Sequence, residues 1–386
     1  MDISQLSFVW YRGLQEISPA AWQTLAGTHP MLDYRFLRAF ELSAAVDHQT
    51  GWIPYHLTVF DGEQLLAAVP CYLKTHSYGE YVFDWSWADA YEQAGGQYYP
   101  KLISAIPFSP VTGPRLLIHP DYAEPQALAA SMLAQMQAFC QAHSLSGVHI
   151  LFPDELSAKE SADAGWLRRN GVQFRWENAG YADWEAFLAT LNRDKRKKIR
   201  QERQKVSQQG VDCREVNGFE VSKTELDLFY RCYCHTYYRH GSSPYLPLAF
   251  FEQVSREMPE QFRLFIAAQN GEDVAASLCV LGADTLYGRY WGSLRDISCL
   301  HFELCYYQPQ LFCIREGIRY FEGGAQGVHK LARGFAPYAT CSYHYLSHAD
   351  FQQSVARFLA REAGTMQHYV DELEERSPYK ATPAAE

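Results

Sequence analysis

An internal repeat places the strongest constraint on what this chain can fold into. Shifted by 209 residues, the sequence aligns 61–102 with 270–311 without a gap. The matched positions are Asp61, Gly62 and Glu63 with Asn270, Gly271 and Glu272; Tyr78, Gly79 and Tyr81 with Tyr287, Gly288 and Tyr290; and Tyr98, Pro100 and Leu102 with Tyr307, Pro309 and Leu311. Isolated matches arise by chance, but this many in one register indicate a duplicated structural unit.

Each copy predicts the same series of elements. Asp-Gly and Asn-Gly tolerate positive φ and therefore favour a tight hairpin. The hydrophobic patterns predict strands over 55–60, 65–73, 78–83 and 115–118 with a helix over 88–103, then strands over 263–268, 274–281, 285–291 and 318–322 with a helix over 300–315. This order resembles the GNAT acyltransferase fold. It predicts an α/β chain of tandem duplicated GNAT-like acyltransferase domains with mixed, mostly antiparallel sheets.

Length and composition agree with two domains. The chain has 386 residues, of which 47% are hydrophobic, so each half can bury its own core. We expect a first domain over 1–178 and a second over 179–386, the second carrying a C-terminal amphipathic helix over 350–375. No apolar run approaches the roughly 20 residues of a membrane span. The N-terminal residues lack the pattern of a signal peptide, which predicts a cytoplasmic protein.

A basic segment, 193–205, contrasts with the rest of the chain. Its eight basic and two acidic residues leave a local charge of about +6, whereas the formal net charge of the chain is −10. The spacing of Leu188, Leu191, Ile199 and Val206 predicts a basic helix over 193–206 with a narrow apolar seam. An exposed, solvated helix is the simpler interpretation. We favour binding of nucleic acid or phosphate, because anions would offset the self-repulsion of Lys195, Arg196, Lys197, Lys198, Arg200 and Arg203.

A glycine-rich segment, 321–335, follows the last strand of the second copy. Its glycines allow the backbone to approach a ligand closely beside His329, Lys330 and Arg333. Glu322 and Arg333 of this segment are candidate substrate contacts. The sequence matches neither the P-loop nor the dinucleotide-binding fingerprint, and an ordinary strand-to-helix loop is the alternative.

Aromatic residues cluster near the predicted strand ends. Tyr290 in the second copy and Tyr81 in the first lie where a substrate cleft could open, although strand aromatics usually belong to the core. Cys232, Cys234 and His235 are close in sequence, but their spacing is not that of a zinc site. We therefore expect no metal.

Several segments together resemble the Fem family of peptidyltransferases. RDKRKKIRQERQKV is similar to the basic stretch that opens the family's second acyltransferase half, and FYRCYCHTYYRHG to the helix that follows it. VAASLCVLGADTLYGRYWGS and YFEGGAQGVHKLARGF are similar to its meander and closing glycine-lysine loop. In the first half, YLKTHSYGEYVFDWSWADAY and YYPKLISAIPFSPVTGPRLL resemble a bacterial Fem-like branch of predicted N-acyltransferases.

The resemblance implies transfer of an aminoacyl group from aminoacyl-tRNA to an amine of a peptidoglycan precursor or similar acceptor. It implies that Lys330 stabilises the tetrahedral oxyanion. His329 stands where the resemblance implies an aromatic residue, and it is a candidate general base because its usual pKa lies near physiological pH. Asp84 and Arg115 are candidates for recognising the acceptor. No cofactor is implied.

Two other functions remain open. An acyl-CoA N-acyltransferase would use a coenzyme A thioester as co-substrate and a phosphate-cradling loop at a helix start, which the sequence does not clearly provide. A non-catalytic protein that recognises peptidoglycan or RNA would bind through the same residues without turnover.

Overall fold

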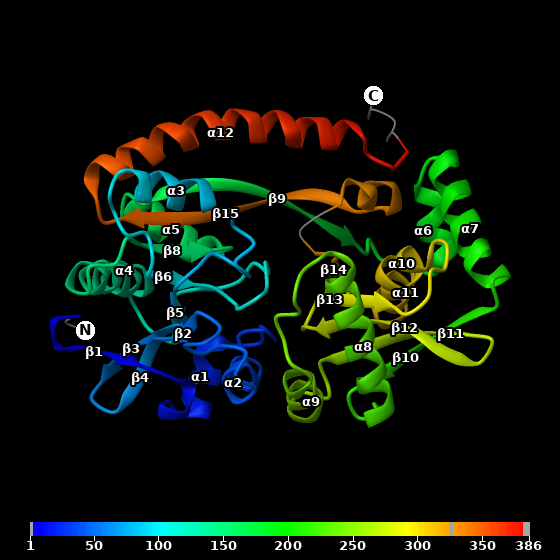
Figure 1. The fold of residues 1–386 in the computed structure, drawn as a ribbon, viewed down its shortest axis with the longest axis horizontal. Helices are drawn as coiled ribbons and strands as arrows, with labels where there is room; N and C mark the ends of the chain where they lie inside the picture. Colours follow the sequence, from blue (N-terminus) through cyan, green and yellow to red (C-terminus); the bar gives the residue numbers. More distant parts are fainter. Residues whose placement is uncertain (1–2, 325–326, 381–386) are drawn as a thin grey trace. The chain divides into compact units, whose positions relative to one another are not determined.

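The computed structural model describes residues 3–324 and 327–380 (Figure 1). Its internal contacts divide the chain into two compact units. Unit 1 contains Met1–Val172 and Ala339–His368, and unit 2 contains Gln173–Tyr338 and Tyr369–Glu386. The chain leaves unit 1 within strand β9 (Leu167–Glu177) and returns to it within β15 (Ala336–Leu346). The first crossing lies near the expected boundary at 178, whereas the return was not predicted. The expected division into domains over 1–178 and 179–386 stays a prediction.

Unit 1 contains two groups of strands. β1, β3, β4 and β7 form an antiparallel sheet in that order. β2, β5 and β6 pair antiparallel, β6 pairs parallel with β8, and Ser342–Leu346 of β15 pairs antiparallel with β8. The elements are η1 (Ile3–Gln5), β1 (Ser7–Tyr11), η2 (Leu14–Glu16), α1 (Pro19–Ala26), α2 (Tyr34–Leu42), β2 (Trp52–Pro54), β3 (His56–Asp61), β4 (Gln64–Val69), β5 (Cys71–Lys74), α3 (Trp85–Gln93), β6 (Lys101–Ser104), β7 (Leu117–Ile118), α4 (Pro125–Ala142), β8 (Gly147–Leu151) and α5 (Glu155–Asp163).

Unit 2 is built on strands ordered β10-β11-β12-β13-β14, with the end of β9 beside β14. All neighbours pair antiparallel except β13 and β14, which are parallel. The elements are α6 (Trp184–Thr190), α7 (Arg193–Gln208), β10 (Val211–Asn217), α8 (Lys223–Arg239), α9 (Leu248–Glu257), β11 (Phe262–Gln269), β12 (Glu272–Leu281), β13 (Thr285–Ser293), α10 (Leu300–Phe302), the π-helical turn η3 (Glu303–Tyr307), α11 (Gln308–Glu316), β14 (Tyr320–Glu322) and η4 (Val328–Arg333).

The two hairpins predicted from the repeat are present. β3 pairs with β4 across the Asp61-Gly62 turn, and β11 pairs with β12 across Asn270-Gly271. Asn270 and Gly271 have φ values of 52° and 83°, the left-handed conformation that a tight hairpin turn requires. In unit 2 the predicted third strand, helix and fourth strand are also confirmed as β13, α10–α11 and β14.

In unit 1 the second half of the repeat was wrongly predicted. Residues 78–83 form turns, because Gly79 and Tyr81 have φ values of 81° and 61°, which an extended strand cannot accommodate. The predicted helix over 88–103 ends early. Gly95, with φ of 85°, follows the end of α3, and the chain then enters β6 at Lys101. Of the predicted strand 115–118, only Leu117–Ile118 is a strand.

The amphipathic C-terminal helix is confirmed as α12 (Ala349–Glu375). Its first part belongs to unit 1 and not to the second domain, since Val355 and Leu359 join Trp87 and Leu346 in a hydrophobic cluster. Among the described residues, no helix combines the length and apolar character needed to cross a bilayer.

A glycine determines how closely α8 packs on the sheet of unit 2. A Cβ atom added at Gly292 of β13 would collide with the backbone carbonyl of Cys232 in α8. Thr236 of the same helix donates a hydrogen bond of 2.9 Å to the carbonyl of Trp291. Only glycine therefore permits this approach of helix and strand.

We expect Gly292→Ala to lower the free energy of unfolding by about 3 kcal/mol, because helix and strand must separate to admit the methyl group. Gly364→Ala is the matched control: Gly364 lies in the exposed part of α12, with nothing within 4 Å of an added Cβ. That change should instead stabilise the protein by about 0.5–1 kcal/mol. Urea denaturation measures the unfolding free energy of both variants. If both changes shifted it in the same direction, the close packing of α8 on β13 at Gly292 would not explain the loss.

Candidate functional site

A small cavity opens in unit 2 where β13 and β14 separate. The two strands pair only from Thr285–Tyr287 to Tyr320–Glu322, while β13 continues to Ser293. The cavity has a volume of about 110 Å³. Its walls come from β12, β13, the residues that follow β14, and the helical segment after β13: Ser277, Leu278, Cys279, Gly288, Arg289, Tyr290, Trp291, His301, Cys305, Tyr306, Gly323 and Gly324. Tyr290, predicted to contact substrate, is therefore a lining residue.

Gly323 and Gly324 line one side of this cavity and are called the glycine wall. Lys330 lies directly behind them. Its Nζ donates a hydrogen bond of 2.7 Å to the carbonyl of Gly324, and the residue is only 2% exposed. A Cβ atom at Gly323 would come within 2.9 Å of Phe335 and 3.4 Å of the Lys330 Cε atom, so the glycine leaves room for the lysine. Burial lowers the pKa of Lys330 to about 7. Its amine can therefore exchange protons near neutral pH.

His329, the preceding residue of η4, is exposed and reaches the same cavity through a partner. Its Nε2 lies 2.9 Å from the hydroxyl of Tyr306, a lining residue. Partial burial and the charges of Arg333 and Lys330 lower the pKa of His329 below its usual value. Burial raises the pKa of Tyr306, so its phenol keeps its proton and can donate to the neutral imidazole.

Arg333 is held by the protein itself. Its Nη2 lies 2.8 Å from both carboxylate oxygens of Glu202 in α7, and its Nη1 donates to the carbonyl of His329 at 2.6 Å. The guanidinium also donates to the hydroxyl of Tyr307 and lies 3.4 Å from the ring centre of Phe302. The Arg333 residue is 1% exposed, and its ion pair with Glu202 links η4 to α7. A direct contact between Arg333 and substrate stays a prediction.

Glu322 ends β14, immediately before the glycine wall. It is 8% exposed, and burial raises its pKa to about 7 although Tyr338, Arg175 and Arg289 oppose the shift. Glu322 does not line the small cavity itself. Ala325 and Gln326, between the glycine wall and η4, lie outside the described residues.

A larger cavity of about 470 Å³ shares Trp291 and His301 with the small one. Its other walls include His235, Thr236, Arg239 and Arg295. Burial lowers the pKa of the shared His301 to about 4, so this imidazole is neutral at physiological pH. The two cavities therefore adjoin at Trp291 and His301.

Sequence reasoning missed His301, Cys305 and Tyr306. They lie in α10 and in the π-helical turn η3, and a π-helical turn shifts side chains from their α-helical positions. The sequence carried one indication of a site here, which was a histidine and two tyrosines in the helix predicted over 300–315. Its 3.6-residue periodicity predicted only a regular helix over 300–315.

The predicted basic helix is confirmed as α7, which begins after the N-cap Asn192. Ile199 and Val206 are buried, as the apolar seam required. Lys197, Lys198 and Arg200 are exposed, whereas Lys195, Arg196 and Arg203 are partly buried. Arg200 pairs with Glu185 and Arg203 with Glu303. The helix therefore presents lysines to solvent on one side while Glu202 faces the interior.

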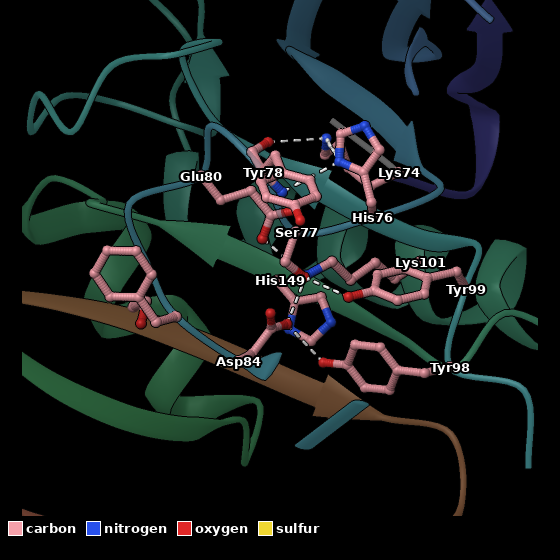
Figure 2. A network of polar contacts seen from close by, with 12 residues as sticks. Lys74, His76, Ser77, Tyr78, Glu80, Asp84, Tyr98, Tyr99, Lys101 and His149 are labelled. Atoms are coloured by element: carbon pink, nitrogen blue, oxygen red, sulfur yellow. Dashed lines mark hydrogen bonds and ion pairs between the residues drawn. The ribbon is translucent and has the colours of Figure 1, made fainter. Parts of the chain in front are cut away.

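The other predicted contacts lie in unit 1. Asp84 belongs to a buried ion cluster around Lys101 (Figure 2). The Lys101 Nζ lies 2.5 Å from Asp84 Oδ2, 2.8 Å from Glu80 Oε2 and 2.9 Å from the hydroxyl of Ser77. Burial would raise the pKa of Asp84, but the Lys101 ammonium, the charge of His149 and the hydrogen bonds from Lys101 and Ser77 together hold that pKa well below its usual range. Asp84 is thus an ionised internal partner of Lys101.

Arg115 and Tyr81 take different positions in unit 1. Arg115 is fully buried, and its guanidinium donates to backbone carbonyls of Val111, Gly113, Pro114 and Leu151. Tyr81 is partly exposed in the turn before Asp84. Recognition of an acceptor by Asp84 or Arg115 and a substrate contact of Tyr81 stay predictions. Asp84 and Arg115 already bind the protein's own groups.

Comparison with known proteins identifies the fold. The FemAB-like family model, described as peptidoglycan biosynthesis/recognition, matches residues 13–381. The chain belongs to the FemAB-like family. The resemblance inferred from the basic stretch and the glycine-lysine loop is thereby confirmed. A search of curated proteins returned no match to the sequence.

Solved structures support the same fold for this FemAB-like protein. The crystal structure of FemX matches with a TM-score of 0.53 at 10% identity, over 88% of this chain and 98% of that chain. The C-terminal DUF2156 domain of a putative lysylphosphatidylglycerol synthetase from Agrobacterium fabrum matches with a TM-score of 0.52 at 10% identity, over 88% and 96% of the two chains. The predicted fold class, a tandem GNAT-like α/β chain, is confirmed.

The buried cluster of unit 1 gives a prediction about the stability of this FemAB-like protein. We expect Lys101→Met to lower the free energy of unfolding by about 3–5 kcal/mol, because Glu80 and Asp84 would remain buried without their cation. Lys223→Met removes the exposed pair of Lys223 with Asp227 in unit 2 and should leave stability unchanged. Chemical denaturation at pH 7 compares the two variants. Equal losses of unfolding free energy would contradict the prediction that the buried cluster stabilises the protein more than an exposed ion pair does.

Proposed function

We propose that this FemAB-like protein is an N-acyltransferase that moves an aminoacyl group from aminoacyl-tRNA to an amine of a peptidoglycan precursor or a similar acceptor. The proposal includes a cytoplasmic location, where aminoacyl-tRNA is found. The observation that carries it is the position of Lys330, a buried amine with a pKa near 7 behind the glycine wall of a small cavity. The family and the basic helix support the choice of reaction and donor.

The donor would bind through its phosphates and its reacting end. The exposed lysines of α7 concentrate positive charge on a chain with a net charge of −10. A polyanion would therefore bind at α7 rather than over the whole surface. Phosphate contacts release counterions, and binding should therefore weaken steeply with salt. The ester-linked aminoacyl group would occupy the 110 Å³ cavity between β13 and β14.

Transfer requires an amine nucleophile and stabilisation of negative charge. The acceptor nitrogen attacks the ester carbonyl, a C–N bond forms, and the carbonyl oxygen becomes an oxyanion. The C–O bond to the tRNA ribose then breaks, and the ribose oxygen takes up a proton. The Lys330 ammonium, which donates to the Gly324 carbonyl behind the cavity wall, would stabilise this oxyanion once the donor is bound.

His329 is the candidate acceptor for the proton that the amine loses. Its lowered pKa keeps the imidazole neutral at physiological pH. Because the lone pair of Nε2 accepts from the Tyr306 hydroxyl, the proton would reach the imidazole through that hydroxyl, which passes its own proton to Nε2 as it takes up the one from the amine. After the C–N bond forms, the same imidazole can return the proton to the departing ribose oxygen. No cofactor takes part in these steps.

We expect Lys330→Met to reduce transfer by about 10²–10³-fold while donor binding persists, since one oxyanion partner is lost. Single-turnover transfer from radiolabelled aminoacyl-tRNA to a soluble peptidoglycan precursor measures the rate. A non-catalytic recognition protein would show no transfer with either form.

The pH profile tests the protonation state of Lys330. Its lowered pKa means that the ammonium is present below about pH 7 and is lost as the pH rises through that value. Transfer should therefore decline above neutral pH in the wild type. Lys330→Arg keeps the charge at higher pH and should remove this decline. An unchanged profile would exclude the ammonium as the stabilising group.

Reversal of charge on α7 tests the donor. Lys197→Glu with Lys198→Glu should weaken tRNA binding more than tenfold at low salt and flatten its dependence on salt concentration. Lys159→Glu, an exposed change in unit 1, is the matched control and should leave binding unchanged. Filter binding over a series of salt concentrations provides the comparison. Bound coenzyme A in the purified protein, without RNA, would favour an acyl-CoA-dependent reaction instead.

A further inference from the structure

A third cavity of unit 2, of about 370 Å³, lies along the basic helix. Its walls come from α6, α7, β10, η3 and the start of α11, and they include Trp184, Arg200, Arg203, Gln204, Ser207 and Glu303. The volume is within the range of small-molecule sites, roughly 300–1,000 Å³. Lys330, His329 and Tyr306 do not line this cavity. The proposed transfer steps therefore leave it without a role.

We propose that an unpaired nucleobase of the RNA donor stacks in this cavity against Trp184 and Arg203, while cations of α7 hold the adjoining phosphates. The inference rests on the proposed function, because it takes aminoacyl-tRNA as the molecule that binds α7. It adds a contact to a base where the proposed function has contacts to phosphates alone.

The stacking surface is already in place. Trp184 opens α6, and its ring packs on those of Phe187 and Tyr307 with centres 5.2 and 6.0 Å apart. The Arg203 guanidinium lies 5.2 Å from the centre of the Trp184 ring, and its Nε donates to Glu303 at 3.2 Å. Unpaired bases stack on aromatic rings and on arginine planes, and the cavity wall provides both.

The inner wall of the cavity suits a neutral base better than a phosphate. The Glu303 side chain is only 5% exposed, and the Gln308 amide donates to its Oε1 at 2.8 Å. Glu185 and Asp212 line the same cavity. Carboxylates repel a phosphate, whereas they accept hydrogen bonds from the amino group of a base. That amino group is available only in a base that is not paired with another strand.

One face of α7 leads from exposed cations to the cavity. Arg193, Lys197, Arg200 and Gln204 recur at intervals of three or four residues, so they lie on the same side of the helix, and all four are exposed. Arg200 and Gln204 line the cavity. The ion pair of Arg200 with Glu185 joins side chains that are 58% and 65% exposed, and such pairs contribute little. A phosphate can therefore replace Glu185 at the cavity mouth.

The cavity also lies close to the candidate reaction site. The π-helical turn η3 contributes Glu303 to this cavity, and Cys305 and Tyr306 to the cavity of about 110 Å³. One helical turn thus forms a wall of both. A base bound in the first cavity would hold the RNA strand beside the second.

The experiment measures binding of an acceptor-stem RNA hairpin with a single-stranded 3′ end to the full-length protein by filter binding. An abasic nucleotide replaces each position of that end in turn, which removes the base and keeps every phosphate. At one position we expect this replacement to weaken binding by about 5- to 100-fold, the usual effect of losing one stacked base.

Ser207→Leu tests whether the cavity holds that base. Ser207 is an exposed cavity residue of α7, and leucine is a good helix former that would fill part of the space. The variant should bind the unmodified RNA as weakly as the wild type binds the abasic RNA, and the abasic replacement should then have no further effect. Gln208→Leu is the matched control: Gln208 is exposed, does not line the cavity, and its replacement should leave binding unchanged.

The other outcomes separate this inference from the proposed donor. If RNA binds but no abasic position weakens binding, or if Ser207→Leu responds to the replacement as the wild type does, the base site is overturned and the tRNA donor stands. If no RNA binds, the tRNA donor is overturned and the base site with it.

Discussion

Burial of the Arg333 charge is the constraint on which the candidate site depends. A guanidinium at 1% exposure must find an anion and acceptors inside the protein, and it finds Glu202, the hydroxyl of Tyr307 and the carbonyl of His329. These partners come from α7, η3 and η4, so the requirements of one side chain bring three separate segments together. Lys330 lies one turn before Arg333, and its place behind Gly324 follows from this arrangement.

The two units bury lysines in opposite ways, and the difference decides which lysine can take part in proton chemistry. In unit 1, two carboxylates surround Lys101; burial would lower its pKa, but Glu80 and Asp84 raise it, and the ammonium ion is permanent. In unit 2, Lys330 has a backbone carbonyl as its hydrogen-bond partner, and burial lowers its pKa to about 7. The first arrangement stabilises a fold, whereas the second keeps an amine ready to gain or lose a proton near neutral pH.

The repeat shows where sequence reasoning was reliable and where it was not. The hairpins at Asp61-Gly62 and Asn270-Gly271 depend on local backbone preference, and both are present. Residues 78–83 have the same aromatic pattern as β13 but form turns, because Gly79 and Tyr81 adopt left-handed conformations and Glu80 turns inward to Lys101. In the same way nothing near Arg333 in the sequence revealed that Glu202, 131 residues away, would be its ion-pair partner, while a contact of Arg333 with substrate stays a prediction. The π-helical turn that places Tyr306 at the cavity had no local signal either.

The sequence by itself determined the duplicated hairpins, the basic helix with its apolar seam, the glycine-lysine segment and the family, because each depends on residues close together in the chain. Only the tertiary structure decided that the chain returns to unit 1 in β15 and which ionisable groups become partners. It alone revealed the cavity between β13 and β14 and the lowered pKa of Lys330. The physical reason is that burial and charge pairing depend on neighbours distant in sequence, and these exist only once the chain has packed.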